Sequence, residues 1–204
     1  MTRFHPIIDR SSARACRATW GLFVTASLLM IPVAAAAQPP PAQPVSMHRP
    51  WVGVGFGWGN ITSTRTEGPD VVLSATFEIP AAPTAGVRLS AERIWSSARD
   101  VGNVSVRQVS ADLMMRRPIG TAFGCVRQIV VGLGAGLYTF AADTGSLDDP
   151  TRLGYQIAAG GDCVGGRLAI GGMFGFRFVD APTHPAFSDN VIAPSATLTL
   201  RIRL

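Results

Sequence analysis

Lysine is absent from this chain of 204 residues, so all 18 basic side chains are arginines, and charged residues make up only 15% of it. Scarce charge combined with 22 glycines argues against coiled coils and charged helical bundles. A hydrophobic fraction of 47% argues against disorder along the whole chain. One folded domain is the expected organisation at this length.

Residues 1–37 have the pattern of a cleaved secretory signal peptide. Four arginines precede an apolar run from Trp20 to Val33, and the run is followed by the small-residue site Ala35-Ala36-Ala37. A transmembrane helix is the alternative, but Pro32 interrupts the run, which is shorter than the roughly 20 residues that cross a bilayer. Cleavage would leave 14 arginines against 12 acidic residues. Nucleic-acid binding needs a clustered basic surface, so it is not expected of a chain in which basic and acidic residues are nearly equal in number.

The remainder of the chain divides into a linker and a series of strands. Residues 38–50 are rich in proline and predict an extended linker. Residues 51–204 form eight segments in which apolar residues alternate with small or polar ones, a pattern typical of β-strands with two different faces. The predicted strands are 51–59, 71–79, 84–96, 104–116, 125–140, 152–161, 164–178 and 192–204.

The seventh segment shows the two faces most clearly. Leucine, isoleucine and phenylalanine between Leu168 and Phe178 occupy one face, and arginine, alanine and glycine between Arg167 and Arg177 occupy most of the other. A soluble sandwich needs an outer face rich in Lys, Glu, Thr and Ser. Glycine interleaved with charge suits the inside of a narrow barrel instead. We therefore predict an all-β fold, a closed antiparallel up-and-down eight-stranded transmembrane β-barrel; a soluble secreted β-barrel or sandwich that binds a ligand is the alternative.

The connections between the segments support a membrane barrel independently of hydrophobicity. Longer and shorter connections broadly alternate along the chain, as expected when extracellular loops are longer than periplasmic turns. Five aromatic residues fall near the predicted outer ends of their strands and predict an aromatic girdle. They are Trp58, Trp95, Tyr138, Phe140 and Phe178.

In alternation and topology, residues 51–204 resemble the eight-stranded outer-membrane β-barrels of Gram-negative bacteria, a group that includes the OmpA transmembrane domain. Members of that group usually end in an aromatic residue after alternating apolar positions. This chain keeps the alternation from Leu198 to Leu204 but ends in leucine. The resemblance implies an outer-membrane location, lipopolysaccharide and other outer-membrane lipids as partners, and in many members no enzymatic activity.

Register converts the alternation into residue pairs. Partners on antiparallel strands have a constant sum of residue numbers, and a sum of about 200 for the third and fourth segments places Arg88 opposite Asp112 inside the barrel. An unpaired buried ion carries a desolvation penalty of several kcal/mol, so we predict an interior network of paired charges. Its members are Glu78, Arg88, Glu92, Asp112, Arg116, Arg167, Arg201 and Arg203. The alternative is that these are exposed charges on soluble strands. Because eight strands enclose little more than their own side chains, no open, porin-like pore is expected.

The same register predicts a basic patch on the outer face. Arg93 lies opposite Arg107 near Trp95, and like charges that face each other across strands repel. An anionic neighbour is therefore expected there, with lipopolysaccharide phosphates as the candidate. Arginines that extend to the headgroup level without a dedicated site are the alternative.

Two of the three cysteines are predicted to form a disulfide. Pairing Ile129 with Ala159 gives a sum of 288 for the fifth and sixth segments, and Cys125 and Cys163 have the same sum. In an oxidising compartment two facing thiols favour a disulfide. The third, Cys16, would leave with the signal peptide.

Few residues suggest a cofactor, a metal or catalysis. The glycines from Gly132 to Gly136 lack the helix that follows a dinucleotide fingerprint, and the aspartates of segment 143–149 lack the spacing of a calcium loop, so no cofactor or metal is predicted. Some barrels of this type modify lipid A, so His184 and Ser188 define an alternative, an acyl hydrolase or transferase, with Asp180 or Asp189 orienting the histidine. The favoured prediction has no catalytic residues: a structural or surface-interaction protein.

Overall fold

The structure, a computed structural model, describes residues 49–60, 70–98, 102–143, 147, 150–180, 182, 187 and 190–204. The predicted signal peptide and nearly all of the predicted linker lie outside these residues. Among the described residues, no α-helix is both long and apolar enough to cross a membrane.

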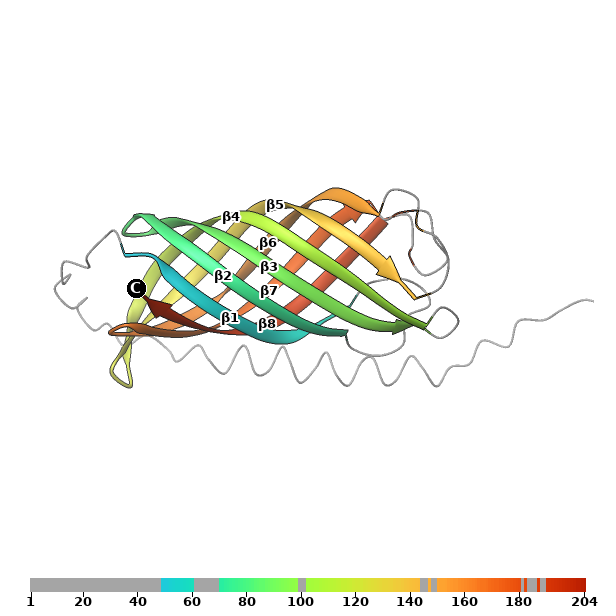
Figure 1. The fold of residues 1–204 in the computed structure, drawn as a ribbon. Helices are drawn as coiled ribbons and strands as arrows, with labels where there is room; N and C mark the ends of the chain where they lie inside the picture. The colour runs from blue at the N-terminus through green and yellow to red at the C-terminus, as the bar shows by residue number, and fades with distance from the viewer. Residues whose placement is uncertain are drawn as a thin grey trace, which may run out of the picture. The chain divides into compact units, whose positions relative to one another are not determined.

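Eight antiparallel strands form a closed barrel in which each strand pairs with its neighbours in the sequence and β1 pairs with β8 (Figure 1). This confirms the predicted fold class. The strands are β1 (Trp51–Gly59), β2 (Asp70–Ala82), β3 (Ala85–Ala98), β4 (Gly102–Ala122), β5 (Cys125–Ala142), β6 (Thr151–Gly165), β7 (Leu168–Asp180) and β8 (Asn190–Arg203).

The two ends of the barrel differ in their connections. Two-residue turns join β2 to β3, β4 to β5 and β6 to β7 at the end where β1 begins and β8 ends, here named the terminus end (Figure 1). The other four connections leave the opposite end, here named the loop end. The predicted register of β3 and β4 is confirmed, because Arg88 pairs with Asp112 and Arg93 with Arg107.

Two predicted connections are strands instead. Residues 117–122 continue β4, and residues 162–163 continue β6, which also takes in 164–165 of the predicted seventh strand. In β4 a register shift between Pro118 and Gly120 accommodates the proline and glycine within the β4–β5 ladder. The β4–β5 turn is Phe123-Gly124, and both residues have positive φ, 51° and 76°.

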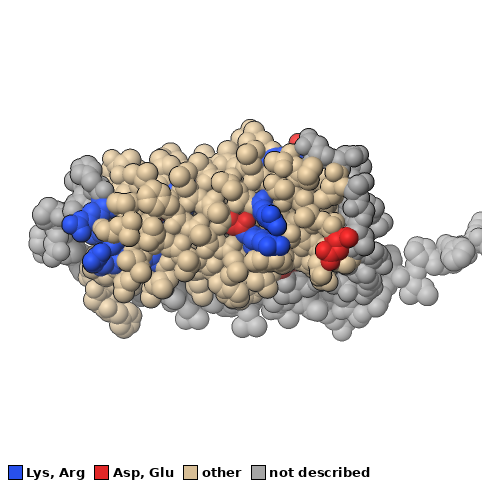
Figure 2. All heavy atoms as spheres, viewed as in Figure 1, with Lys and Arg blue, Asp and Glu red and all other residues tan. Residues whose placement is uncertain are grey.

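The outer face of the barrel is apolar, as the alternation predicted. At mid-barrel Leu133 exposes 61% of its surface, and Ile170 and Leu198 each expose 62%. Charged side chains cover little of the face seen in Figure 2. A band of exposed leucine, isoleucine, valine and phenylalanine around a closed sheet suits contact with hydrocarbon rather than with water.

Inside the loop end the barrel is filled by apolar side chains. The buried cluster consists of Val72, Ile94, Val104, Val106, Tyr138, Phe140, Val179, Phe187 and Ala193. The girdle prediction is therefore wrong for Tyr138 and Phe140, whose even numbers place them on the same inner face of β5 as Gly132 and Gly136. Trp58 and Phe178 do face outward.

Candidate functional site

Three arginines converge on one carboxylate in the terminus-end half of the interior. Glu78 Oε2 accepts hydrogen bonds from Arg116 Nη2 at 2.6 Å, Arg201 Nη1 at 3.0 Å and Arg88 Nη2 at 3.1 Å. Asp162 pairs with Arg201 and lies 3.8 Å from Arg116 Nε. These five residues, here named the Glu78 cluster, come from β2, β3, β4, β6 and β8, so they link strands all around the barrel.

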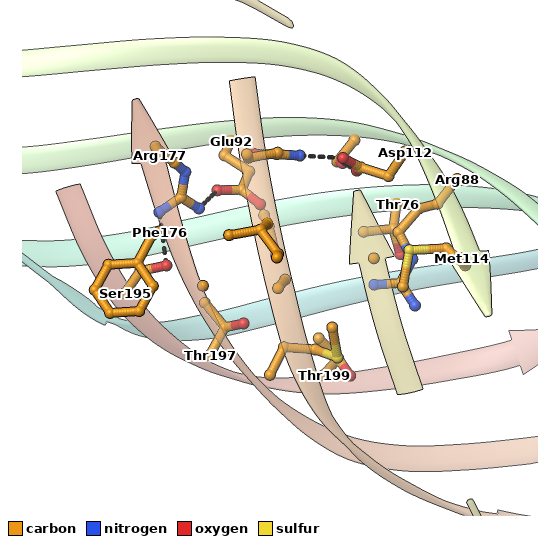
Figure 3. A pocket seen from close by; sticks show the side chains of 18 residues that line it. Thr76, Arg88, Glu92, Asp112, Met114, Phe176, Arg177, Ser195, Thr197 and Thr199 are labelled. Atoms are coloured by element: carbon orange, nitrogen blue, oxygen red, sulfur yellow. Dashed lines mark hydrogen bonds and ion pairs between the residues drawn. The ribbon is translucent and has the colours of Figure 1, made fainter. Parts of the chain in front are cut away.

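A second ion pair lies closer to the loop end. Arg177 pairs with Glu92 and donates from Nη1 to Ser195 Oγ at 2.6 Å (Figure 3). It also donates from Nε to Gln108 Oε1 at 2.7 Å. These four residues form the Arg177 cluster. Since its guanidinium bonds to three residues on three other strands, Arg177 ties β7 to β3, β4 and β8.

Neutral side chains connect the Arg177 cluster to Asp112. Ser90 Oγ donates to Asp112 Oδ2 at 3.1 Å, and Gln156 bonds to both Ser110 Oγ and Asp112. Gln108 Nε2 reaches the same Ser110 hydroxyl at 3.1 Å. The polar interior is thus hydrogen-bonded across β3, β4 and β6, which is the condition under which buried polar groups are tolerated.

Charge is balanced within the two clusters and Asp112. The two clusters and Asp112 contain four arginines (Arg88, Arg116, Arg177 and Arg201) and four carboxylates (Glu78, Glu92, Asp112 and Asp162). A small cavity of about 60 Å³ lies between the clusters, lined by residues of both (Figure 3). Gly134 faces Asp112 and Gly171 faces Asp162 so closely that a Cβ at either position would overlap the carboxylate. Glycine on the inner face therefore makes room for the charges.

Two predicted network members lie outside it. Arg167 is exposed in the β6–β7 turn, where its Nε donates to the carbonyl oxygen of Arg203 at 3.2 Å. Arg203 is half-buried at the terminus end, with its Cζ 4.5 Å from the centroid of the Trp51 ring. The prediction is wrong for both, because the turn and the strand end lie beyond the level of the interior carboxylates.

Two charged members of the clusters, Asp162 and Arg177, escaped sequence analysis, as did the neutral Gln108 and Ser195. Asp162 fell in a predicted connection, although it lies on the inner face of β6. The sequence pattern assigned Arg177 to the inner face correctly. The register of neighbouring strands does not reveal its partners on β3, β4 and β8, however. Arg88, although opposite Asp112, directs its guanidinium to Glu78 on its other side.

The predicted basic patch lies on the outer face near the loop end. Arg93 and Arg107 are register partners, and the Arg93 guanidinium carbon lies 4.8 Å from the centroid of the Trp95 ring. Their partners on the flanking strands are Leu73 and Thr139, which carry no charge. Two guanidinium groups therefore meet at the surface with no carboxylate beside them in register.

Cys125 and Cys163 form a disulfide with a Cα–Cα distance of 5.5 Å. The register used to predict it is wrong by two residues, since Cys163 pairs with Arg127 and the strand sum is 290. The bond is diagonal across β5 and β6, and it forms because a shift of two residues leaves both cysteines on the same face.

Of the alternative catalytic residues, one lies within the described part of the chain. His184, Ser188 and Asp189 lie outside the described residues, and Asp180 is exposed at the end of β7. The described residues include no group of three His, Cys, Asp or Glu side chains arranged to hold a metal ion.

Comparisons with known proteins bear on the fold. No family model and no curated protein matches the sequence. Neisserial surface protein A (NspA) matches the structure with a TM-score of 0.59 and 10% identity, over 76% of this chain and 96% of that chain. This chain has the fold of an eight-stranded outer-membrane β-barrel.

Two further solved structures are similar at a lower level. The Yersinia pestis attachment invasion locus protein Ail matches with a TM-score of 0.46 and 12% identity, over 76% of this chain and 97% of that one. A designed transmembrane β-barrel matches with a TM-score of 0.45 and 10% identity, over 77% of this chain and 96% of the design.

Proposed function

We propose that this protein is a closed outer-membrane barrel with a structural or surface-interaction role toward lipopolysaccharide. Residues 1–37 are the signal peptide that directs its export and is then cleaved. The observation that carries the proposal is the inside-out distribution of side chains: apolar residues face outward, and charges are paired inside. A filled interior supports no solute pathway, so the protein acts through its outer surface and loop end rather than through a pore.

The Arg93–Arg107 patch supports lipopolysaccharide as the partner. With the loop end outside the cell, the two arginines lie near the outer-leaflet headgroups, beside Trp95. Guanidinium groups bind phosphate through paired, charge-assisted hydrogen bonds, and an anion between the two would relieve their repulsion.

Replacement of both arginines tests this role. We expect Arg93→Ser with Arg107→Ser to lower the lipopolysaccharide retained by the purified barrel at least tenfold, since each lost charge-assisted bond is worth about 1.5 kcal/mol or more, and one such bond alone is about tenfold in affinity. Retention is measured by the phosphate content of the purified protein. The matched control is Arg49→Ser with Arg167→Ser, which removes the same charge from exposed positions at the terminus end. Equal retention by wild type and the patch variant would dismiss the site.

A further inference from the structure

The β4–β5 hairpin differs from the other two turns at the terminus end. It bends away from the barrel wall, and its turn projects farther than the β2–β3 and β6–β7 turns (Figure 1). Ile119 is the extra residue of the register shift that bends it, and 45% of its surface is exposed. Phe123, at the tip, is fully exposed, at 105% of the reference surface. An exposed phenylalanine and isoleucine on a projecting hairpin need an apolar environment.

Two arginines lie at the base of this hairpin on the outer face. Arg117 is exposed and pairs with Ile129, and Arg127 is half-buried and pairs with Gly120 and Cys163. None of these register partners is acidic. The buried Nε of Arg127 has no hydrogen-bond partner among the described residues.

The whole terminus end is basic where it is described. Arg49 and Arg167 are also exposed there, and Figure 2 shows basic side chains gathered at this end. The aspartate and glutamate side chains of the described residues lie elsewhere. Glu78, Glu92, Asp112 and Asp162 are inside the barrel, and Asp70, Asp143 and Asp180 are at the loop end.

The level of the two arginines indicates what lies beside them. Met115 and Ile129, the outward residues next along the strands toward the barrel middle, are exposed and apolar. The apolar band therefore ends where Arg117 and Arg127 begin, which is the headgroup level of the leaflet on this side. A guanidinium pair at that level matches a phosphate group, and an apolar tip beside it matches acyl chains.

We propose that Arg117 and Arg127 bind an anionic phospholipid headgroup of the leaflet at the terminus end, with the bent hairpin lying along the interface so that Ile119 and Phe123 contact its acyl chains near the headgroup. The disulfide supports this arrangement, because Cys125 lies two residues from both Phe123 and Arg127 and ties the hairpin to β6. The inference rests on the membrane placement proposed above, and it concerns the opposite leaflet from the lipopolysaccharide patch.

Lipid titration tests the headgroup site. The folded barrel in detergent is titrated with phosphatidylglycerol or phosphatidylcholine of identical acyl chains, and bound lipid is counted by native mass spectrometry. We expect wild type to prefer phosphatidylglycerol, and each guanidinium lost in Arg117→Gln with Arg127→Gln to reduce the preference about fivefold. Arg49→Gln with Arg167→Gln, which removes the same charge at the same end but leaves the hairpin unchanged, is the matched control and should keep it. Equal binding of both lipids by wild type, or an equal loss in the control, would overturn the proposal.

The position of the hairpin tip is tested separately in vesicles containing phosphatidylglycerol. We expect the added fluorescence of Phe123→Trp, relative to wild type, to be quenched by phospholipids brominated on the acyl chain and protected from acrylamide in water. Full acrylamide quenching would place the tip in water and contradict the inference. Heat-modifiable gel mobility and vesicle flotation are recorded for the same samples. A barrel that folds and floats but fails both tests overturns the hairpin site alone, whereas a barrel that does not enter vesicles overturns the proposed function.

Discussion

Glu78→Ala is expected to lower the free energy of unfolding of the barrel by about 3–5 kcal/mol, the usual loss when one member of a buried ion pair is removed. Glu78 accepts hydrogen bonds from Arg88, Arg116 and Arg201, and its side chain is almost completely buried. Removing the carboxylate leaves three buried guanidinium groups with Asp162 as the remaining carboxylate of the cluster. Among the described interior residues, no other single substitution separates so many charges from their partner.

Urea titration of the refolded barrel in lipid vesicles, followed by tryptophan fluorescence, measures this loss. Asp180→Asn is the control, because it neutralises one exposed carboxylate at a strand end and should change stability by less than about 0.5 kcal/mol. A stability change for Glu78→Ala no larger than that of the control would show that the three arginines do not depend on Glu78.

The filled interior also predicts the electrical behaviour of the barrel. In planar bilayers wild type should give no large, stable conductance, and such a conductance would contradict the filled interior.

Leu133→Arg is expected to destabilise the barrel in a bilayer by about 2–4 kcal/mol, the cost of arginine on the lipid face at the midplane. Leu133 is exposed in the middle of β5, and its register partners Leu113 and Ile157 are also exposed. An exposed leucine on a soluble protein tolerates arginine with little change. The substitution therefore separates a lipid-facing surface from a water-facing one.

The same urea titration in vesicles measures the effect, and the control is an arginine at a different depth in the bilayer. Ile192→Arg places the same side chain on the outer face near the loop end of β8, where we expect a loss of about 0–1 kcal/mol. Equal effects at the two positions would argue against a membrane that surrounds the middle of the barrel.

The strand faces were predictable because period-two alternation is set by the backbone itself. On β7 and β8 the alternating leucine, isoleucine and phenylalanine residues mark the lipid side, and closure follows from eight such strands. The β5–β6 register was harder for a physical reason. A shift of two residues keeps every side chain on its face, so both registers have the same hydrophobic pattern. The position of the turn determines which of the two registers forms. Asp162 resembled a turn residue but lies within β6.

Less of the interior could be predicted than of the outer face. Arg88 and Glu78 are inward because an unpaired charge does not face hydrocarbon, which a sequence shows. The choice of partner depends on side-chain reach across the barrel, as when Arg177 bonds to Ser195 and Glu92. At the loop end the pattern inverts, with Val106 inside and Arg107 outside, so an apolar interior there is hidden from an analysis that assigns apolar residues to the lipid.

The most direct test of the account is the accessibility of individual methyl groups in lipid nanodiscs. The barrel is methyl-labelled for NMR, and signal loss is compared between a spin label on the lipid acyl chain and a gadolinium chelate in water. We predict that Leu133 and Leu198 lose signal only to the lipid label, while Met114, buried inside, is protected from both. Leu133 and Leu198 protected from the lipid label, or broadened by the chelate, would contradict an apolar outer face in contact with lipid.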